Sequence, residues 1–242
     1  MPRLNLRRRT RLAVAAAVLL IAVAAADRVL AAVAAGRIAE RLQCAAGLAG
    51  PPSVDIGGVV FLPQAISGRY TSIDVTAQDV RRGGLRLARV RANLRDLTSH
   101  DGATSVGDVS VEAVLGFDAL PDRLGDRPVS YGAADGLLAI ATTADLAGQR
   151  LPVTLLARPT IGDGALRIEP QEVEVLGVRR PAKGLLDRLG AHPAGRDLPQ
   201  LPAGLAYRGV TVTGDGLAVT AGGTDLSVRQ SGTSDHDCGA KR

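Results

Sequence analysis

The chain has 242 residues, of which 46% are apolar and 22% are charged, so it can bury a core and is not disordered throughout. It has five aromatic residues, two cysteines and three histidines, which excludes a base-stacking surface for single strands, a zinc ribbon and an iron–sulfur site. Five of its 29 basic residues lie among the first eleven residues, which hold no acid, and the remaining 24 are matched by 24 acids. The net charge of +5 therefore belongs to one N-terminal arm, and no nucleic-acid-binding face is expected.

The N-terminus has the pattern of an export signal. An uncharged stretch, residues 12–26, follows the arginine-rich arm. Its 15 residues suit the core of a signal peptide and are short for a membrane span of about 20 residues. Small residues at 22–24 and 24–26 fit a cleavage site, whereas the return of apolar residues at Val29 fits an uncleaved signal anchor. Both interpretations place the arginines in the cytoplasm and the rest of the chain in the extracytoplasmic cell envelope.

The next segment, residues 27–48, is predicted to be a helix. Leu30, Ala34, Ile38 and Leu42 recur every four residues, and no proline interrupts them. Gly47 and the glycine and prolines that follow it are expected to end the helix.

From there to about residue 230 the sequence alternates between short apolar runs and turn residues, which indicates strands joined in hairpins. Turns are expected at Gly83-Gly84, Asp163-Gly164, Asp215-Gly216 and Gly222-Gly223. Two helical pieces, residues 118–124 and 181–189, interrupt the series. The strands are expected at 73–78, 85–94, 109–115, 137–141, 151–155, 166–168, 173–175, 210–212, 217–219 and 226–228.

These elements predict an α+β fold, with a long N-terminal helix packed in a curved, mostly antiparallel sheet. The domain organisation is a signal peptide or signal anchor at 1–26, an α+β domain at 27–230, and a polar tail at 231–242 that is expected to be disordered.

Cys44 and Cys238 lie near the two ends of the exported part, in a compartment where disulfides persist. A bridge between them would tie the tail to the first helix and close a loop of nearly the whole domain. Two unpaired thiols are the alternative.

No catalytic motif, paired general acid and base, or metal site is recognisable, so we expect neither an enzyme nor a cofactor. The tail around His236 carries acids and a cysteine, but adjacent residues in a polar chain end favour a solvated tail over a metal site.

The most informative segment is an apolar loop that contains Phe61, Leu62 and Ile66 between glycines. Bulky apolar residues in a loop either meet lipid as an exposed tip or plug one end of the core. Both interpretations stay open at this point. Phe117, Leu120 and Leu185 are further candidates for lipid or membrane contact.

Two stretches, residues 54–70 and 198–217, carry a resemblance to a known protein family. The first contains Val-Asp-Ile-Gly-Gly, Phe-Leu and Gly-Arg-Tyr, and the second contains Leu-Pro-x-Leu-Pro-x-Gly-Leu and Asp-Gly-Leu. Over residues 27–230 the chain resembles the LmeA-like phospholipid-binding proteins of actinobacterial cell envelopes. The resemblance implies a tubular lipid-binding type of fold and an extracytoplasmic lipid-binding module. Members of the family are linked to phosphoinositide binding and to the maturation of mannan-type lipoglycans.

The residues support a lipid-binding function independently, because aliphatic linings suit acyl chains without aromatic stacking. Arg69, Arg179 and Arg180 are candidates for contact with a lipid phosphate, and ordinary surface arginines are the alternative. The leading hypothesis is a non-enzymatic protein that binds a phospholipid at a membrane and acts in envelope lipid or lipoglycan biogenesis. The alternative is a membrane-tethered scaffold without lipid cargo, whose protein partners are unknown.

Overall fold

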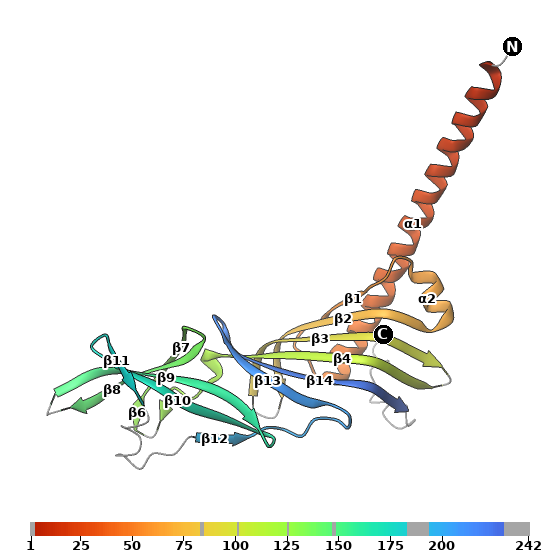
Figure 1. Ribbon diagram of the computed structural model, residues 1–242. Helices are drawn as coiled ribbons and strands as arrows, with labels where there is room; N and C mark the ends of the chain where they lie inside the picture. The colour runs from red at the N-terminus through yellow and green to blue at the C-terminus, as the bar shows by residue number, and fades with distance from the viewer. Residues whose placement is uncertain are drawn as a thin grey trace.

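The computed structural model describes residues 3–82, 85–100, 102–124, 126–146, 149–182 and 194–229. Over these ranges it contains a long N-terminal helix, α1 (Arg3–Ala46), a short helix, α2 (Phe61–Ser67), and two antiparallel sheets of several strands. The sheets lie end to end in an elongated body, and α1 projects from one end of it (Figure 1). The fold is α+β, with a long N-terminal helix and a mostly antiparallel sheet, as the sequence predicts.

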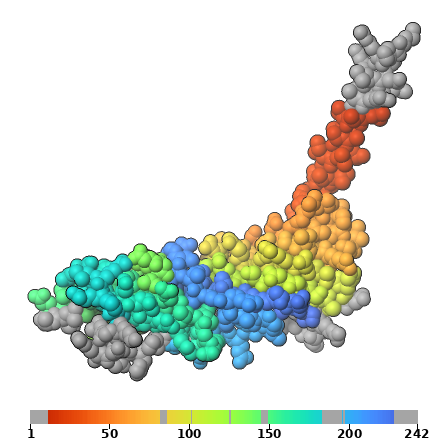
Figure 2. Space-filling view, in the orientation of Figure 1, coloured from red at the N-terminus to blue at the C-terminus, as the bar shows by residue number. Residues whose placement is uncertain are grey.

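Helix α1 joins the apolar stretch 12–26 and the helix predicted at 27–48 into one continuous element. It ends at Ala46 because Gly47 adopts a left-handed conformation with φ 62°, and the Leu48 N–H donates to the carbonyl of Gln43. Residues 12–26 are exposed on every side of the helix and project from the body without contacting it (Figure 2). By length and composition Leu12–Ala46 could cross a membrane, a test that a signal sequence near the N-terminus also passes.

The buried face of α1 differs by one position from the predicted one. Ala31, Ala35 and Ala39 are buried, whereas Leu30, which begins the predicted apolar row, is 46% exposed. Ala31 and Ala35 pack against Ile56 of β1 (Ser53–Ile56). Their small methyl groups let the strand approach the helix axis closely, which larger side chains would prevent.

The proximal sheet, which carries α1, has six strands in the order β1-β2-β3-β4-β14-β13, all paired antiparallel. Besides β1, its strands are β2 (Arg69–Arg82), β3 (Leu85–His100), β4 (Ala103–Gly116), β14 (Gly216–Arg229) and β13 (Ala206–Thr213).

The distal sheet has the order β11-β10-β9-β8-β7, and β12 also pairs with β10. Leu138 and Ile140 of its strand β8 form a buried cluster with Leu217 of β14, so the two sheets meet through a packed core. β5 (Arg123–Leu124) and β6 (Arg127–Pro128) form a separate two-stranded sheet, and the hydroxyl of Thr142 in β8 donates to the Pro128 carbonyl of β6. The distal strands are β11 (Val178–Pro181), β10 (Ala165–Val175), β9 (Gln149–Gly162), β8 (Leu137–Leu146), β7 (Ser130–Ala134) and β12 (Ala194–Asp197).

The hairpin turns follow the predicted chemistry where the structure describes them. Asp163 and Gly164 both have positive φ (52° and 73°), which a tight turn of primed type requires. A turn at Gly214 and Asp215 joins β13 to β14, next to the expected Asp215-Gly216 position. Gly83 and Gly84 lie outside the described residues.

The turn predicted at Gly222-Gly223 is wrong, because both glycines lie inside β14. A Cβ at Gly223 would collide with the carbonyl of Gly204, and one at Gly222 would crowd the carbonyl of Val109. These glycines therefore permit close backbone approach, and the strands expected at 217–219 and 226–228 are one strand. The runs at 166–168 and 173–175 are likewise one strand, β10, with an irregularity between Pro170 and Glu172.

The helical piece predicted at 118–124 is also wrong. The chain forms a single 3₁₀ turn at η1 (Phe117–Ala119), after which Leu120 is extended. Pro121 follows Leu120, and a residue before proline is disfavoured in helical conformation. The other predicted piece, residues 181–189, begins at the end of β11, and its positions 183–189 lie outside the described residues.

Candidate functional site

One face of the proximal sheet is lined by aliphatic side chains across its strands. Directly opposite residues of antiparallel strands share a face, and Val54 and Ile56 of β1 face α1 because they pack with Ala31 and Ala35. The strand register extends this α1-side surface, here called the apolar face, across β2, β3, β4, β14 and β13. Its three ladders are Ile56–Ile73–Leu94–Val109, Val54–Val75–Ala92–Val111–Ala221 and Ala77–Val90–Ala113–Val219–Val210.

The middle of the apolar face is not sealed from solvent. Val75, Ala92 and Val111, at its centre, remain partly exposed. Helix α1 makes its closest backbone contacts with the edge strand β1 and with α2. The partly exposed centre of this face can therefore contact an apolar ligand. Its aliphatic side chains suit methylene chains better than flat rings.

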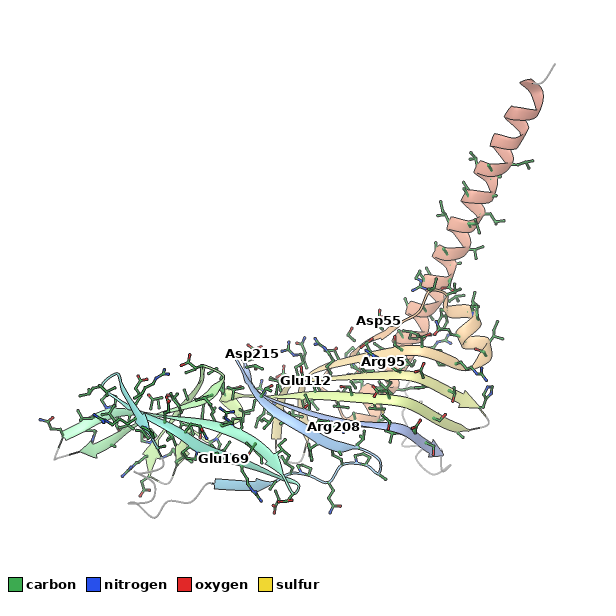
Figure 3. All side chains as sticks on the ribbon, viewed as in Figure 1. Asp55, Arg95, Glu112, Glu169, Arg208 and Asp215 are labelled. Carbon is green, nitrogen blue, oxygen red and sulfur yellow. The ribbon has the colours of Figure 1, made fainter. Side chains whose placement is uncertain are left out.

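The opposite face of the same sheet is polar. The Asn93 side chain donates a hydrogen bond to Asp74 at 2.7 Å, and Arg95 donates to Asn93 at 3.1 Å. Asp55, Arg95 and Glu112, labelled in Figure 3, belong to this polar face by the same register. The central rows of the sheet thus have a polar side and an aliphatic side, and the polar side ends at the buried pair Val114 and Ala218.

A cavity of about 400 Å³ lies between α1 and β1, at the edge of the apolar face. Small residues of α1, among them Ala31, Ala35 and Gly36, line one wall, and β1 with Val54 and Ile56 lines the other. A Cβ added at Gly36 would meet nothing within 4 Å, so the cavity has free space beside the helix. Val54 and Ile56 therefore line both the cavity and the edge of the apolar face.

Asp27 and Arg28 tie α1 to α2. The Asp27 carboxylate is 2% exposed and accepts hydrogen bonds from the backbone N–H groups of Phe61 (2.9 Å to each oxygen) and Leu62 (2.8 Å). The Arg28 guanidinium donates to the carbonyls of Gly58 (3.1 Å) and Val59. The α2 helix has no side-chain cap of its own, so Asp27 caps it from a distant part of the sequence. We call these four residue contacts the clasp.

The structure assigns different positions to the three candidates of the apolar loop. Phe61 is buried with Ile56, Ala31 and Ala35, so it plugs the end of the core. Leu62 and Ile66 are exposed, Ile66 to 82%. Phe61 therefore has the position of a core plug, whereas Leu62 and Ile66 have the exposed position that a lipid-contacting tip requires; their contact with lipid stays a prediction.

The other apolar candidates are separate from that loop. Phe117 packs against the buried cluster where the two sheets meet, and Leu120 follows it, partly exposed. Leu185 lies outside the described residues.

The three arginine candidates also differ. Arg179 of β11 is bound by carboxylates, 2.6 Å from Asp135 and 2.8 Å from Glu174, and these hydrogen bonds raise the pKa of Arg179. Its neighbour Arg180 is exposed on the same short strand. Arg69, directly after α2, is exposed and makes no ion pair with the described residues. Of the three, Arg69 is the one that is both unpaired and near the apolar loop.

Cys44, in the last turn of α1, is disulfide-bonded. Its expected partner, Cys238, lies outside the described residues, so the pairing of these two cysteines stays a prediction.

Titratable groups do not gather into a recognisable reaction centre in the described part of the chain. Within those residues no group of three or more His, Cys, Asp and Glu side chains could hold a metal. Burial raises the pKa of Tyr207, whose hydroxyl donates to the Pro199 carbonyl at 2.8 Å. Burial, and to a smaller extent the charge of Asp122, raises the pKa of Tyr131. Both tyrosines are therefore neutral near pH 7.

An aliphatic sheet face, open to solvent and backed by a polar face, is a surface that can hold an acyl chain. The family model described as LmeA-like phospholipid-binding matches residues 25–222, which is most of the chain. The chain belongs to the LmeA-like phospholipid-binding family. No curated protein matched the chain.

Membership of the LmeA-like family covers both sheets and the part of α1 that begins just before the clasp. The apolar face was not recognised from sequence, although its signal was present. Each strand alternates between aliphatic and polar residues, but only the register shows that the aliphatic rows align. The sequence does not predict the clasp, because nothing around a single acid after an apolar stretch indicates which backbone groups it will bind.

Proposed function

We propose that this LmeA-like protein binds a phospholipid by laying its acyl chains along the apolar face, and that it does so without catalysing a reaction. The observation that carries the proposal is the alignment of three aliphatic ladders on a face whose centre is partly exposed. The family membership supports phospholipid as the ligand class.

The energetics favour acyl chains over a smaller apolar ligand. Each methylene removed from water contributes about 0.8 kcal/mol, so a chain that covers only part of the face is already held firmly. The face spans several strands, and the cavity beside α1 adjoins its edge. The headgroup then remains at the solvent-exposed margin, where Arg69, which makes no ion pair among the described residues, is one available phosphate contact.

The proposed location is the extracytoplasmic side of the cytoplasmic membrane, with α1 retained as the anchor and the arginine arm in the cytoplasm. Support comes from the continuity of α1: the residues that follow the apolar stretch are part of the folded body. The proposed role is in cell-envelope lipid or lipoglycan biogenesis, with phosphoinositide as a candidate cargo from the family resemblance.

Photo-crosslinking tests where the lipid binds. The full chain is reconstituted in vesicles that contain a phospholipid with a diazirine on one acyl chain, irradiated and digested. We expect crosslinked peptides from β2, β3 and β4 at apolar-face positions such as Val75, Ala92 and Val111. Crosslinks confined to residues 12–26 would mean that the body holds no lipid, and would favour the tethered scaffold.

A matched pair of variants on one strand sharpens this test. Val111→Lys places a charge on the apolar face, whereas Ser110→Lys places it on the polar face between Asp108 and Glu112. We expect Val111→Lys to remove most of the crosslinking to the body and Ser110→Lys to leave it unchanged. Equal crosslinking in the two variants would contradict binding on the apolar face.

A further inference from the structure

The α2 region presents an uncharged apolar surface to solvent. Val59 is 93% exposed and Ile66 is 82% exposed, and Val60 and Leu62 beside them are also exposed. No charged residue occurs between Ile56 and Gly68. We call Val59, Val60, Leu62 and Ile66 the apolar tip. Such a cluster is unfavourable in water unless an apolar environment covers it.

The clasp fixes the apolar tip relative to α1. Asp27 holds the N–H groups of Phe61 and Leu62, and Arg28 holds the carbonyls of Gly58 and Val59. Both are the first residues after the uncharged stretch 12–26. Figure 1 shows α2 beside α1 at the end of the body from which the helix projects. The height of the tip along α1 is therefore set by the structure.

The length of the uncharged stretch indicates that the apolar tip lies within the thickness of a bilayer that α1 crosses. Fifteen helical residues rise roughly 22 Å, whereas the hydrocarbon core of a bilayer is about 30 Å thick. Apolar residues continue after the clasp, because Val29, Leu30 and Val33 are 62%, 46% and 49% exposed. They can supply the missing length, and the apolar tip lies beside them.

The burial of Asp27 is compatible with a position near the edge of the hydrocarbon core. A carboxylate near the hydrocarbon boundary is costly unless it is paired and shielded. Asp27 is almost fully covered, accepts three backbone hydrogen bonds and lies 3.5 Å from Arg28. The clasp therefore lets an acid sit at this level without exposing its charge.

We propose that α2 is seated in the outer leaflet of the bilayer that α1 crosses, with the apolar tip among the acyl chains. Arg69, directly after the uncharged segment, then lies near the level of the lipid phosphates. This inference rests on the retained anchor of the proposed function and does not depend on whether the apolar face holds a lipid.

The chain contains no tryptophan, so single tryptophans report depth without background. Ile66→Trp and Val59→Trp place the probe on the apolar tip, Leu20→Trp places it in α1, and Val178→Trp places it on exposed β11 of the distal sheet. Each full-length variant is reconstituted in vesicles of phosphatidylcholine and phosphatidylglycerol, with or without acyl-brominated phosphatidylcholine, and its fluorescence quenching is measured.

We expect strong quenching at positions 20, 59 and 66, and little at 178. Quenching at 20 with positions 59 and 66 as unquenched as 178 would overturn the seating of α2 and leave the anchor intact. Absence of quenching at 20 would overturn both the anchor and this inference. Crosslinking on the apolar face is measured separately, so failure of lipid binding and failure of seating are distinguishable.

Discussion

At Asp27 a single carboxylate connects the projecting helix to the folded body. Its two oxygens accept three hydrogen bonds from α2, where no local side chain caps the helix. Removing it leaves the N–H groups of Phe61 and Leu62 without partners in a partly buried setting. The residue is therefore important for how α2 is held, although nothing in its sequence neighbourhood singles it out.

We predict that Asp27→Ala loosens α2. The amides of Phe61 and Leu62 should exchange with deuterium faster than in the parent protein, and the melting temperature should fall by a few degrees. Asp27→Asn keeps one acceptor oxygen and should give an intermediate result. If amide exchange at Phe61 and Leu62 were the same in Asp27→Ala as in the parent, the clasp would have no structural role.

Phe61 and Ile66 show why the apolar loop could not be resolved from sequence. Both are bulky apolar residues in one short segment, and composition does not say which side of a helical turn faces the core. The structure buries Phe61 to 8% exposure and leaves Ile66 exposed.

We predict that Phe61→Ala lowers the free energy of unfolding by about 3–5 kcal/mol, because it leaves a cavity in the core. Ile66→Ala should change it by less than about 0.5 kcal/mol, because the side chain has few neighbours to lose. Chemical denaturation of both variants measures the difference. Equal destabilisation would mean that Ile66 is a core residue as well.

At the scale of elements, most strands and the fold class could be predicted, because period-two alternation and Asp-Gly turns are local signals. The wrong helix at 118–124 overlooked a local signal, Pro121, whereas the wrong turn at Gly222-Gly223 arose where distant contacts decide the outcome. Gly222 and Gly223 have the composition of a turn, yet they allow the backbone around Gly204 to approach β14. The apolar face depends on register between strands, which a single sequence does not contain.

The continuity of α1 leads to a prediction about processing. The expected cleavage sites at 22–24 and 24–26 lie in an uninterrupted helix, directly before the buried Asp27. Signal peptidases act on extended substrate, so the helical conformation of this stretch, continued by the part of α1 that packs on the body, opposes cleavage. The intact mass of the protein isolated from membranes should therefore include residues 1–26. A mature form that begins at residue 25 or 27 would contradict the retained anchor.

At the scale of the molecule, the two sheets meet through the buried cluster of Leu138, Ile140 and Leu217. The apolar face continues into this packed junction through Val210, which pairs with Val219 of its third ladder and packs on the cluster. The two ends of the described body differ in their contacts: one packs against α1 and carries the aliphatic ladders, and the other carries the ion pairs around Arg179.

The predicted bridge from Cys44 to Cys238 would also act on the whole molecule. By the chain-entropy argument, a loop of this length stabilises the fold by up to about 4–5 kcal/mol. Cys238→Ser should lower the free energy of unfolding by up to that amount, and peptide mapping without reductant should recover the two cysteines in one peptide pair. Recovery of Cys44 in a bridge between two chains would contradict the intramolecular pairing.

The central claim is that the apolar face of the proximal sheet holds a phospholipid. It is tested most directly by native mass spectrometry of the full-length protein, released from membranes in nanodiscs or mild detergent, with Val111→Lys and Ser110→Lys measured beside it. We predict a phospholipid adduct that survives removal of the detergent in the parent and in Ser110→Lys, and is lost in Val111→Lys. A bare protein mass in the parent, or an adduct equally retained in Val111→Lys, would contradict the claim.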